Sequence, residues 1–180
     1  EALTNLSHLY LGMGNTDAAI EALEKIKASG AADRRALATL GRAYENAGRH
    51  REAVEIFEKV VTMGGDTSAL RHSLANNLVL SGQYDKALKA YKKLVSEEPR
   101  DPELQLRLSQ IYRQKRRFEK AWDHLRRAAE LAPDSLEVKY NSVLLYESEG
   151  KEDQAIEEME KLLAETEKKS YTQREKRSRT

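Results

Sequence analysis

Apolar side chains return every three or four residues along most of the chain, which is the spacing of amphipathic α-helices. Between residues 36 and 47 they form one stripe, made of Ala36, Leu37, Leu40, Tyr44 and Ala47. Gly48 follows this stripe, and glycine ends a helix readily because it enters the left-handed conformation without a Cβ clash. A second stripe then holds Ala53, Val54, Phe57, Val60 and Val61. The pattern predicts two helices joined by a turn of about three residues.

This two-helix pattern occurs five times with a period of 34 residues. One column is invariant and holds Ala19, Ala53, Ala87, Ala121 and Ala155. A second column holds Tyr10, Tyr44, Leu78, Tyr112 and Tyr146. The turn column holds Gly14, Gly48, Gly82 and Gly150, and Arg116 replaces the glycine in the fourth copy. A single hairpin cannot bury both of its apolar stripes, so we expect the copies to stack into an all-α solenoid of five antiparallel helix-turn-helix repeats.

The repeat register divides the chain into five copies, at about residues 1–32, 33–66, 67–100, 101–134 and 135–167. Polar capping residues are expected where first helices begin: Asp101 before Pro102, and Asp66, Thr67, Asp134 and Ser135 at the equivalent entries. Beyond residue 167 the register stops, because Lys176 falls where a leucine should stand and Arg177 where a small residue should. Residues 168–180 are therefore predicted to form a basic tail or a solvated extension of the last helix.

Composition narrows the class of protein. Of the 180 residues, 39% are hydrophobic and 34% are charged, while nine Gly and three Pro leave few helix breakers. The absence of cysteine removes disulfides and thiolate metal sites. A net charge of +1 gives no overall field that would select nucleic acid or an anionic membrane. No apolar run approaches the roughly 18 residues of a membrane span.

The first residue is Glu1 rather than Met, so we expect a processed form or a piece of a longer protein. No targeting segment is visible in the sequence. The location in the cell therefore stays unassigned, and the cytoplasm is compatible with it.

The sequence holds no pattern typical of catalysis or metal binding. The four histidines are His8, His50, His72 and His124, and none has the His-x-x-x-His or His-Glu-x-x-His spacing that puts two ligands on one helix face. No glycine-rich phosphate loop is present. We therefore predict no catalytic residue, no metal site and no cofactor, and the chain is not expected to be an enzyme.

Residues 1 to about 166 resemble a tetratricopeptide repeat array. The resemblance rests on the leucine, small residue and tyrosine of the first helix, the turn glycine, the alanine and large apolar residue of the second helix, and the closing Pro99 and Pro133. It departs from the family pattern where Ala31, Gly65 and Glu167 replace the closing proline. The resemblance implies a right-handed superhelix in which the first helices line a concave groove that holds extended peptides.

Carried onto this sequence, the groove should be lined by the polar stripe of each first helix. In the second copy that stripe holds Arg35, Thr39, Arg42 and Asn46, and in the fifth it includes Asn141. The residues expected to contact a partner are Arg42, His72, Asn76, Arg107, Gln110, Arg113 and Tyr140. The Lys and Asn set with which related chaperone adaptors clamp a C-terminal carboxylate fits no three consecutive copies.

Charge is unevenly distributed among the copies. Residues 100–133 hold nine basic and five acidic residues, a net charge of +4, whereas residues 134–167 hold three and eleven, a net charge of −8. Residues 168–180 carry a net charge of +5, from six basic residues and one acidic residue. The densest basic run is Arg113, Lys115, Arg116 and Arg117, which is either a docking patch for an acidic segment or a solvated turn.

The sequence thus predicts a non-catalytic scaffold for protein-protein interaction that holds a peptide or partner segment in the groove of the first helices. The expected partner is a protein or peptide with acidic character, and no nucleic acid is expected. Two alternatives stay open. The array is the recruiting arm of a larger enzyme whose catalytic domain lies outside residues 1–180, or it is a structural module that self-associates through its uncapped C-terminal end.

Overall fold

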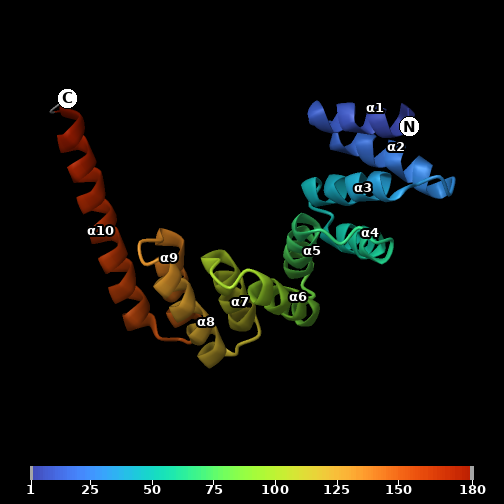
Figure 1. The fold of residues 1–180 in the computed structure, drawn as a ribbon. Coiled ribbons are helices and arrows are strands. Elements are labelled where there is room, and N and C mark those ends of the chain that lie inside the picture. Colours follow the sequence, from blue (N-terminus) through green and yellow to red (C-terminus); the bar gives the residue numbers. More distant parts are fainter. Residues whose placement is uncertain (1, 179–180) are drawn as a thin grey trace. The chain divides into compact units, whose positions relative to one another are not determined.

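The computed structural model describes residues 2–178, and the side chains of residues 3–167. Across this range the chain forms helices joined by short turns and no strand (Figure 1). The first five helices are α1 (Ala2–Gly12), α2 (Thr16–Ala28), α3 (Arg34–Asn46), α4 (His50–Thr62) and α5 (Ser68–Leu80). The others are α6 (Tyr84–Glu97), α7 (Pro102–Gln114), α8 (Phe118–Leu131), α9 (Leu136–Ser148) and α10 (Glu152–Ser178). The all-helical fold predicted from the repeat is confirmed.

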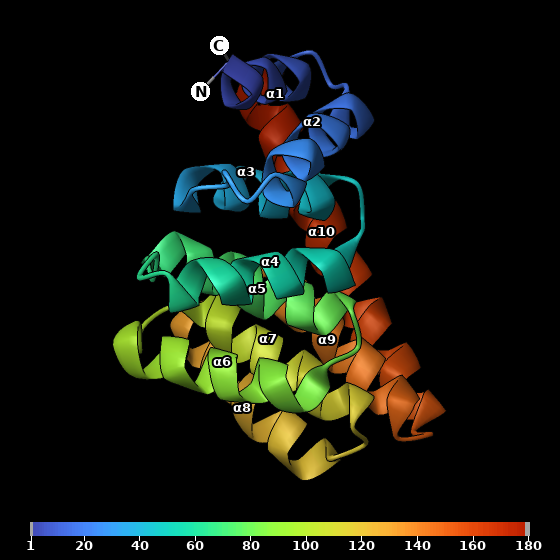
Figure 2. The same ribbon diagram turned by 90° about the vertical axis from the view of Figure 1, so that its right-hand side faces the viewer.

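Two compact units make up the chain, residues 1–90 and 91–180, and the boundary falls within α6. In the first unit, α2 packs on α3, α3 on α4 and α4 on α5 (Figure 2). The core between α2, α3 and α4 is formed by Ile20, Leu23, Ile26, Leu37, Leu40, Ala43, Tyr44, Ala53, Ile56, Phe57 and Val60. At the edge of this core the Tyr44 hydroxyl donates to Glu24, and burial followed by this hydrogen bond raises the pKa of Tyr44 to about 12.

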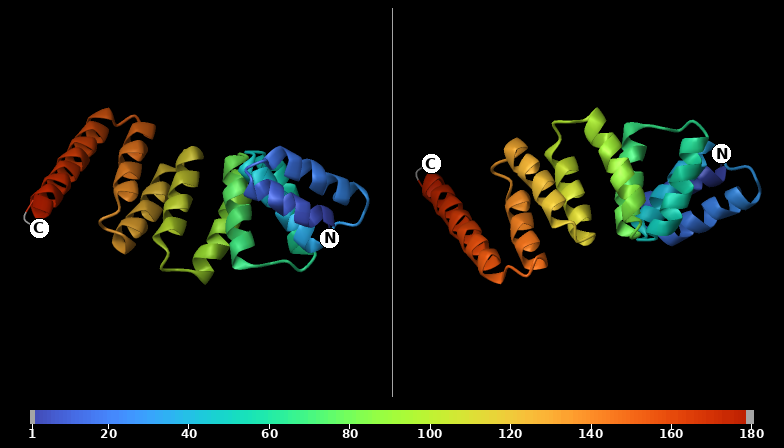
Figure 3. Two further views of the ribbon diagram at one scale, coloured as in Figure 1. Left: turned by 90° about the horizontal axis from the view of Figure 1, so that it is seen from above. Right: turned by 90° about the horizontal axis from the view of Figure 1, so that it is seen from below.

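The second unit repeats this construction with α7 on α8, α8 on α9 and α9 on α10. α9 and α10, coloured orange to red, lie side by side in both views of Figure 3. The Trp122 indole packs against the Tyr146 ring with centroids 4.6 Å apart, and its N–H donates to Glu149. Trp122 thus lies in the contact between the fourth and fifth hairpins.

Side chains of the predicted type cap the first helices. Asp33 accepts a hydrogen bond from the Ala36 N–H at 2.7 Å, and Asp101 accepts one from the Glu103 N–H at 2.8 Å. In the two other entries, Thr67 caps α5 at 3.2 Å and Ser135 caps α9 at 3.3 Å. Such caps satisfy N–H groups that have no partner within the helix, and they fix where each first helix begins.

The turn between the two helices of a hairpin requires a left-handed residue. Gly48 has φ of 71° and Gly150 has φ of 76°, and Arg116 adopts φ of 54° at the equivalent position of the fourth hairpin. The arginine therefore keeps the turn of the other copies despite its side chain.

The last helix, α10, begins at Glu152 and continues to Ser178, beyond the end of the fifth copy at residue 167. Helical backbone thus extends into the segment predicted to be a tail or a helix extension, of which residues 179 and 180 lie outside the described part. Within residues 2–178, no helix is long and apolar enough to span a membrane.

Candidate functional site

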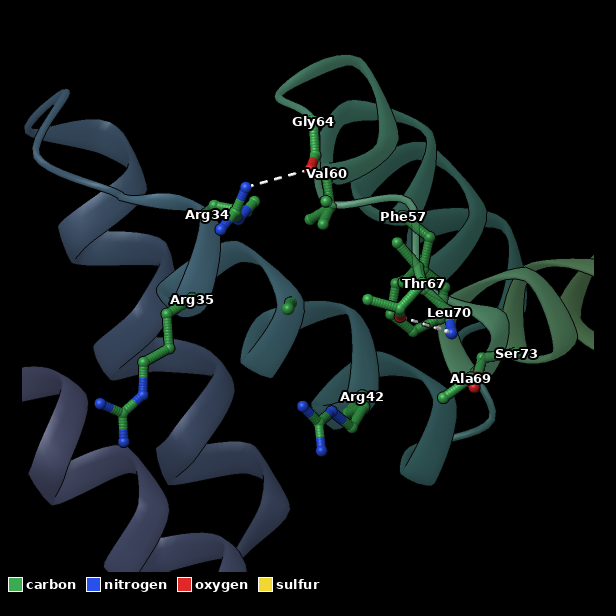
Figure 4. A pocket seen from close by; sticks show the side chains of 12 residues that line it. Arg34, Arg35, Arg42, Phe57, Val60, Gly64, Thr67, Ala69, Leu70 and Ser73 are labelled. Carbon is green, nitrogen blue, oxygen red and sulfur yellow. Dashed lines mark hydrogen bonds between the residues drawn. The ribbon is translucent and has the colours of Figure 1, made fainter.

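A groove of about 460 Å³ opens in the first unit between α3 and α5 (Figure 4). Its walls come from the first helices of two successive hairpins, and its floor comes from the end of α4 and the following loop. The lining residues are Arg34, Arg35, Ala38, Arg42, Phe57, Val60, Gly64, Gly65, Thr67, Ala69, Leu70 and Ser73.

The floor of the groove is apolar. Phe57 and Val60 are buried core residues whose side chains reach the groove, and Ala38 and Leu70 are half-buried beside them. Because these four side chains present only carbon atoms, this part of the groove suits an apolar side chain of a partner.

Three arginines line the groove, but only Arg34 is held by the protein. Its Nη1 donates to the Gly64 carbonyl oxygen at 3.0 Å, which ties α3 to the loop after α4. Within the described part of the chain, the guanidinium groups of Arg35 and Arg42 make no hydrogen bond or ion pair, and both residues are exposed. The two guanidinium groups therefore leave uncompensated positive charge along one wall.

Acidic groups close in sequence to the groove-lining residues are already engaged, among them Glu45, which lies three residues after Arg42 and accepts a hydrogen bond from Asn77. Asp33 caps α3, and Asp66 forms an ion pair with Arg71 at 3.1 Å. Neither carboxylate is paired with Arg35 or Arg42, so no ion pair neutralises the positive charge of these two side chains.

Of the predicted contact residues in the first unit, the structure places Arg42 on the groove wall. His72 and Asn76 are half-buried on α5 and are not among the lining residues. Arg35 belongs to the predicted polar stripe and does line the groove, whereas Arg34 lies outside that stripe and was missed. The sequence feature that could have pointed to Arg34 is its position directly after Asp33, the residue that caps α3.

A buried polar cluster next to the groove was also missed. The Asn77 Nδ2 donates to the Glu45 carboxylate at 2.7 Å, and the Asn77 Oδ1 lies 2.8 Å from the His50 Nδ1. Asn77 occupies a column that is alanine, isoleucine or leucine in the neighbouring copies, at Ala43, Ile111 and Leu145. An amide at such a position is tolerated because its hydrogen bonds are satisfied.

In the second unit, two of the predicted residues belong to one hydrogen-bond network. The Arg107 guanidinium pairs with Glu103 at 2.7 Å and donates to the side-chain Oε1 of Gln110 at 3.1 Å. The Gln110 amide donates in turn to the Asn141 Oδ1 at 3.1 Å, which links α7 to α9. These side chains already satisfy one another, so a ligand would have to compete with protein partners.

The remaining two predicted residues of this unit differ in exposure. The Arg113 Nη1 donates to the Leu144 carbonyl oxygen at 3.4 Å, while its buried Nε has no partner. Tyr140 on α9 is 44% exposed. Thr39 and Asn141, which the polar stripe placed toward the groove, are buried and bond the backbone one turn earlier, at Arg35 and Glu137.

The half-buried side chain of His124 is held by contacts within the second unit. Its ring stacks on Tyr112 with centroids 5.4 Å apart, and its Nδ1 lies 2.8 Å from the Gln105 Oε1. Burial, followed by the positive charge of Arg127, lowers the pKa of His124. Within the described residues, no group of three or more His, Asp or Glu side chains could hold a metal ion.

Comparison with models of known protein families identifies the family of this chain. Tetratricopeptide repeat models match residues 4–66, 72–136 and 136–168. The chain belongs to the tetratricopeptide repeat family. No curated protein sequence matches it.

Solved structures of this family share the fold at low sequence identity. MamA 41-end from Desulfovibrio magneticus RS-1 is 21% identical with a TM-score of 0.76, and the match covers 91% of this chain and 92% of that one. MamA MSR-1 is 22% identical with a TM-score of 0.72, covering 93% and 96%. MamA AMB-1 is 22% identical with a TM-score of 0.71, covering 92% and 91%. At this identity the likeness concerns the fold.

Proposed function

We propose that this tetratricopeptide repeat protein is a non-catalytic interaction module, and that the groove between α3 and α5 binds an extended, acidic segment of a partner protein. The observation that carries the proposal is the pair Arg35 and Arg42, two arginines without protein partners on the wall of an apolar-floored groove. Guanidinium groups bind carboxylates in a bidentate manner, and such charge-assisted hydrogen bonds are stronger than neutral ones.

The spacing of the two arginines specifies the segment. Arg35 and Arg42 are seven residues apart on one helix, which corresponds to roughly 10 Å at 1.5 Å per residue. An extended chain in the polyproline II conformation rises about 3.1 Å per residue with three residues per turn, so it covers that distance in about three residues and points both acidic side chains the same way. The best ligand therefore carries two acidic residues separated by two others, with an apolar side chain between them over Phe57, Val60 and Leu70.

The other residues predicted to contact a partner are proposed to make weaker contacts than Arg35 and Arg42. His72 and Asn76 on α5 are proposed to contact the flanks of the segment. Arg107, Gln110, Arg113 and Tyr140 are proposed to contribute a weaker polar surface in the second unit, since Arg107, Gln110 and Arg113 already have protein partners.

Fluorescence anisotropy with a labelled peptide of the pattern acid-x-apolar-acid tests the proposal. The single variants Arg35→Ala and Arg42→Ala should each weaken binding about tenfold, the loss expected for one hydrogen bond to a charged group. Arg51→Ala is the matched control, because Arg51 is also exposed but lies on α4 outside the groove lining. Equal affinity for a peptide with lysines in place of the acids would refute the proposal.

A further inference from the structure

The first helix has an apolar face that is open to solvent. On α1, Leu9 is 65% exposed and Met13, directly after the helix, is 80% exposed, with Leu3 and Leu6 also exposed. One repeat later the residues equivalent to Leu3, Leu6 and Leu9 are Leu37, Leu40 and Ala43, and all three are buried. They are buried because α2 packs on α3, whereas within residues 2–90 no helix packs on α1 in that way.

The last helix has the complementary open face. On α10, Ile156 is 58% exposed and Leu163 is 55% exposed. The residue equivalent to Ile156 in the first hairpin is Ile20, which is buried in the core shared by α2 and α3. α10 is the second helix of the fifth hairpin. It thus exposes the face that, in the first, second and fourth hairpins, packs on the first helix of the following hairpin.

We propose that α10 of one copy of this chain packs on α1 of a second copy, in the way that α2 packs on α3. Because the repeats share one period of 34 residues, each contact between neighbouring hairpins predicts an equivalent pair across this interface. Glu24 and Tyr44, which share a hydrogen bond between α2 and α3, correspond to Glu160 and to Tyr10 of the second copy. Trp122 and Glu149, which contact between α8 and α9, correspond to Ile156 and Met13.

Charge favours this occupant over a second α10. The acidic side chains Asp153 and Glu160 lie on α10 three residues before and four residues after Ile156, so two such helices placed face to face would bring like charges together. Residues 2–12 of α1 contain no Asp, Glu, Lys or Arg. An uncharged apolar face can therefore cover Ile156 and Leu163 without like-charge contacts.

The contact joins two different surfaces, so every added copy leaves one α1 face and one α10 face open. Such heterologous association grows into open chains or closes into rings. We expect the weight-average mass of the full 180-residue chain to rise above 20.5 kDa with concentration in sedimentation velocity and light scattering. A chain that stays monomeric at millimolar concentration would overturn the proposal.

Two single variants give a sharper test. Leu9→Glu disables the α1 face and Ile156→Glu disables the α10 face, and both residues are exposed, so folding should be unaffected. Each variant alone should remain monomeric, whereas an equimolar mixture should form a 1:1 heterodimer of twice the monomer mass, since each partner supplies one intact face. Leu80→Glu, an equally exposed leucine on α5, is the control and should associate like the parent. A mixture that stays monomeric, or an isolated Leu9→Glu variant that still dimerises, would contradict the head-to-tail arrangement.

Discussion

At the scale of single residues, Arg116 bears a conformation that the rest of the array gives to glycine. Its φ of 54° puts the backbone in the left-handed region, where the Cβ of an L-residue crowds the following carbonyl oxygen. The turn is nevertheless held in place by the Arg117 N–H, which donates to the Tyr112 carbonyl oxygen at 2.9 Å. The Arg116 guanidinium lies 5.6 Å from the Phe118 ring centroid, a contact that recovers part of the strain.

Replacing Arg116 by glycine should therefore stabilise the protein. Relief of the left-handed strain favours the variant by about 1 to 2 kcal/mol, and loss of the contact with Phe118 offsets about 0.5 to 1 kcal/mol of it. The expected net gain of about 0.5 to 1 kcal/mol is measured by urea unfolding. Gly150→Arg, the reverse exchange at the equivalent turn of the next hairpin, should destabilise by a similar amount. If both variants unfold at the parental midpoint, the strain assigned to Arg116 is absent.

At the scale of helices, the close approach of α3 and α4 depends on Gly41. A Cβ at this position would lie 2.3 Å from the Phe57 Cε1, far inside van der Waals contact. The Phe57 ring is buried in the core of the first unit and cannot swing away freely. Glycine inside a helix reduces its intrinsic stability, and here the tight packing of the ring compensates.

Gly41→Ala should consequently destabilise the first unit although alanine is the better helix former. Overpacking costs about 1 to 3 kcal/mol, and the gain in helix propensity recovers at most about 1 kcal/mol. We expect a net loss of about 1 to 2 kcal/mol in chemical unfolding. In a Phe57→Leu background the same substitution should cost much less, because the clashing ring is gone. An equal cost in both backgrounds would show that Phe57 is not the obstacle.

Helices and their caps could be predicted from the sequence because both depend on residues close along the chain. The repeat predicted the helices found in residues 2–178, and capping chemistry predicted the starts at Asp101 and Ser135. The candidate site was harder to predict because burial depends on neighbouring hairpins. The positions along the helix Arg34–Asn46, taken alone, put Thr39 in its polar stripe, but in the structure this side chain is buried. Nor could spacing reveal that Arg35 and Arg42 lack partners while Arg107 and Gln110 bond each other.

At the scale of the whole molecule, the chain offers two surfaces that rest on different physical forces. The groove of the first unit combines an apolar floor with two unpaired cations, so the binding of an acidic segment proposed there would be largely electrostatic. The faces of α1 and α10 are dominated by exposed leucine, isoleucine and methionine, so the association proposed for them would depend on burial of apolar surface. Salt screens the first interaction and leaves the second intact.

Raising NaCl from about 0.05 M to 0.5 M should accordingly separate the two activities, because the Debye length falls from about 14 Å to about 4 Å. Affinity for the acidic peptide should fall about tenfold in anisotropy, while the mass distribution in sedimentation should be unchanged or shift upward. The variants provide internal controls. Leu9→Glu should keep the salt-sensitive peptide binding, and Arg42→Ala should keep the salt-resistant association. Self-association that dissolves in salt together with peptide binding would mean that the copies meet through the arginine groove and not through α1 and α10.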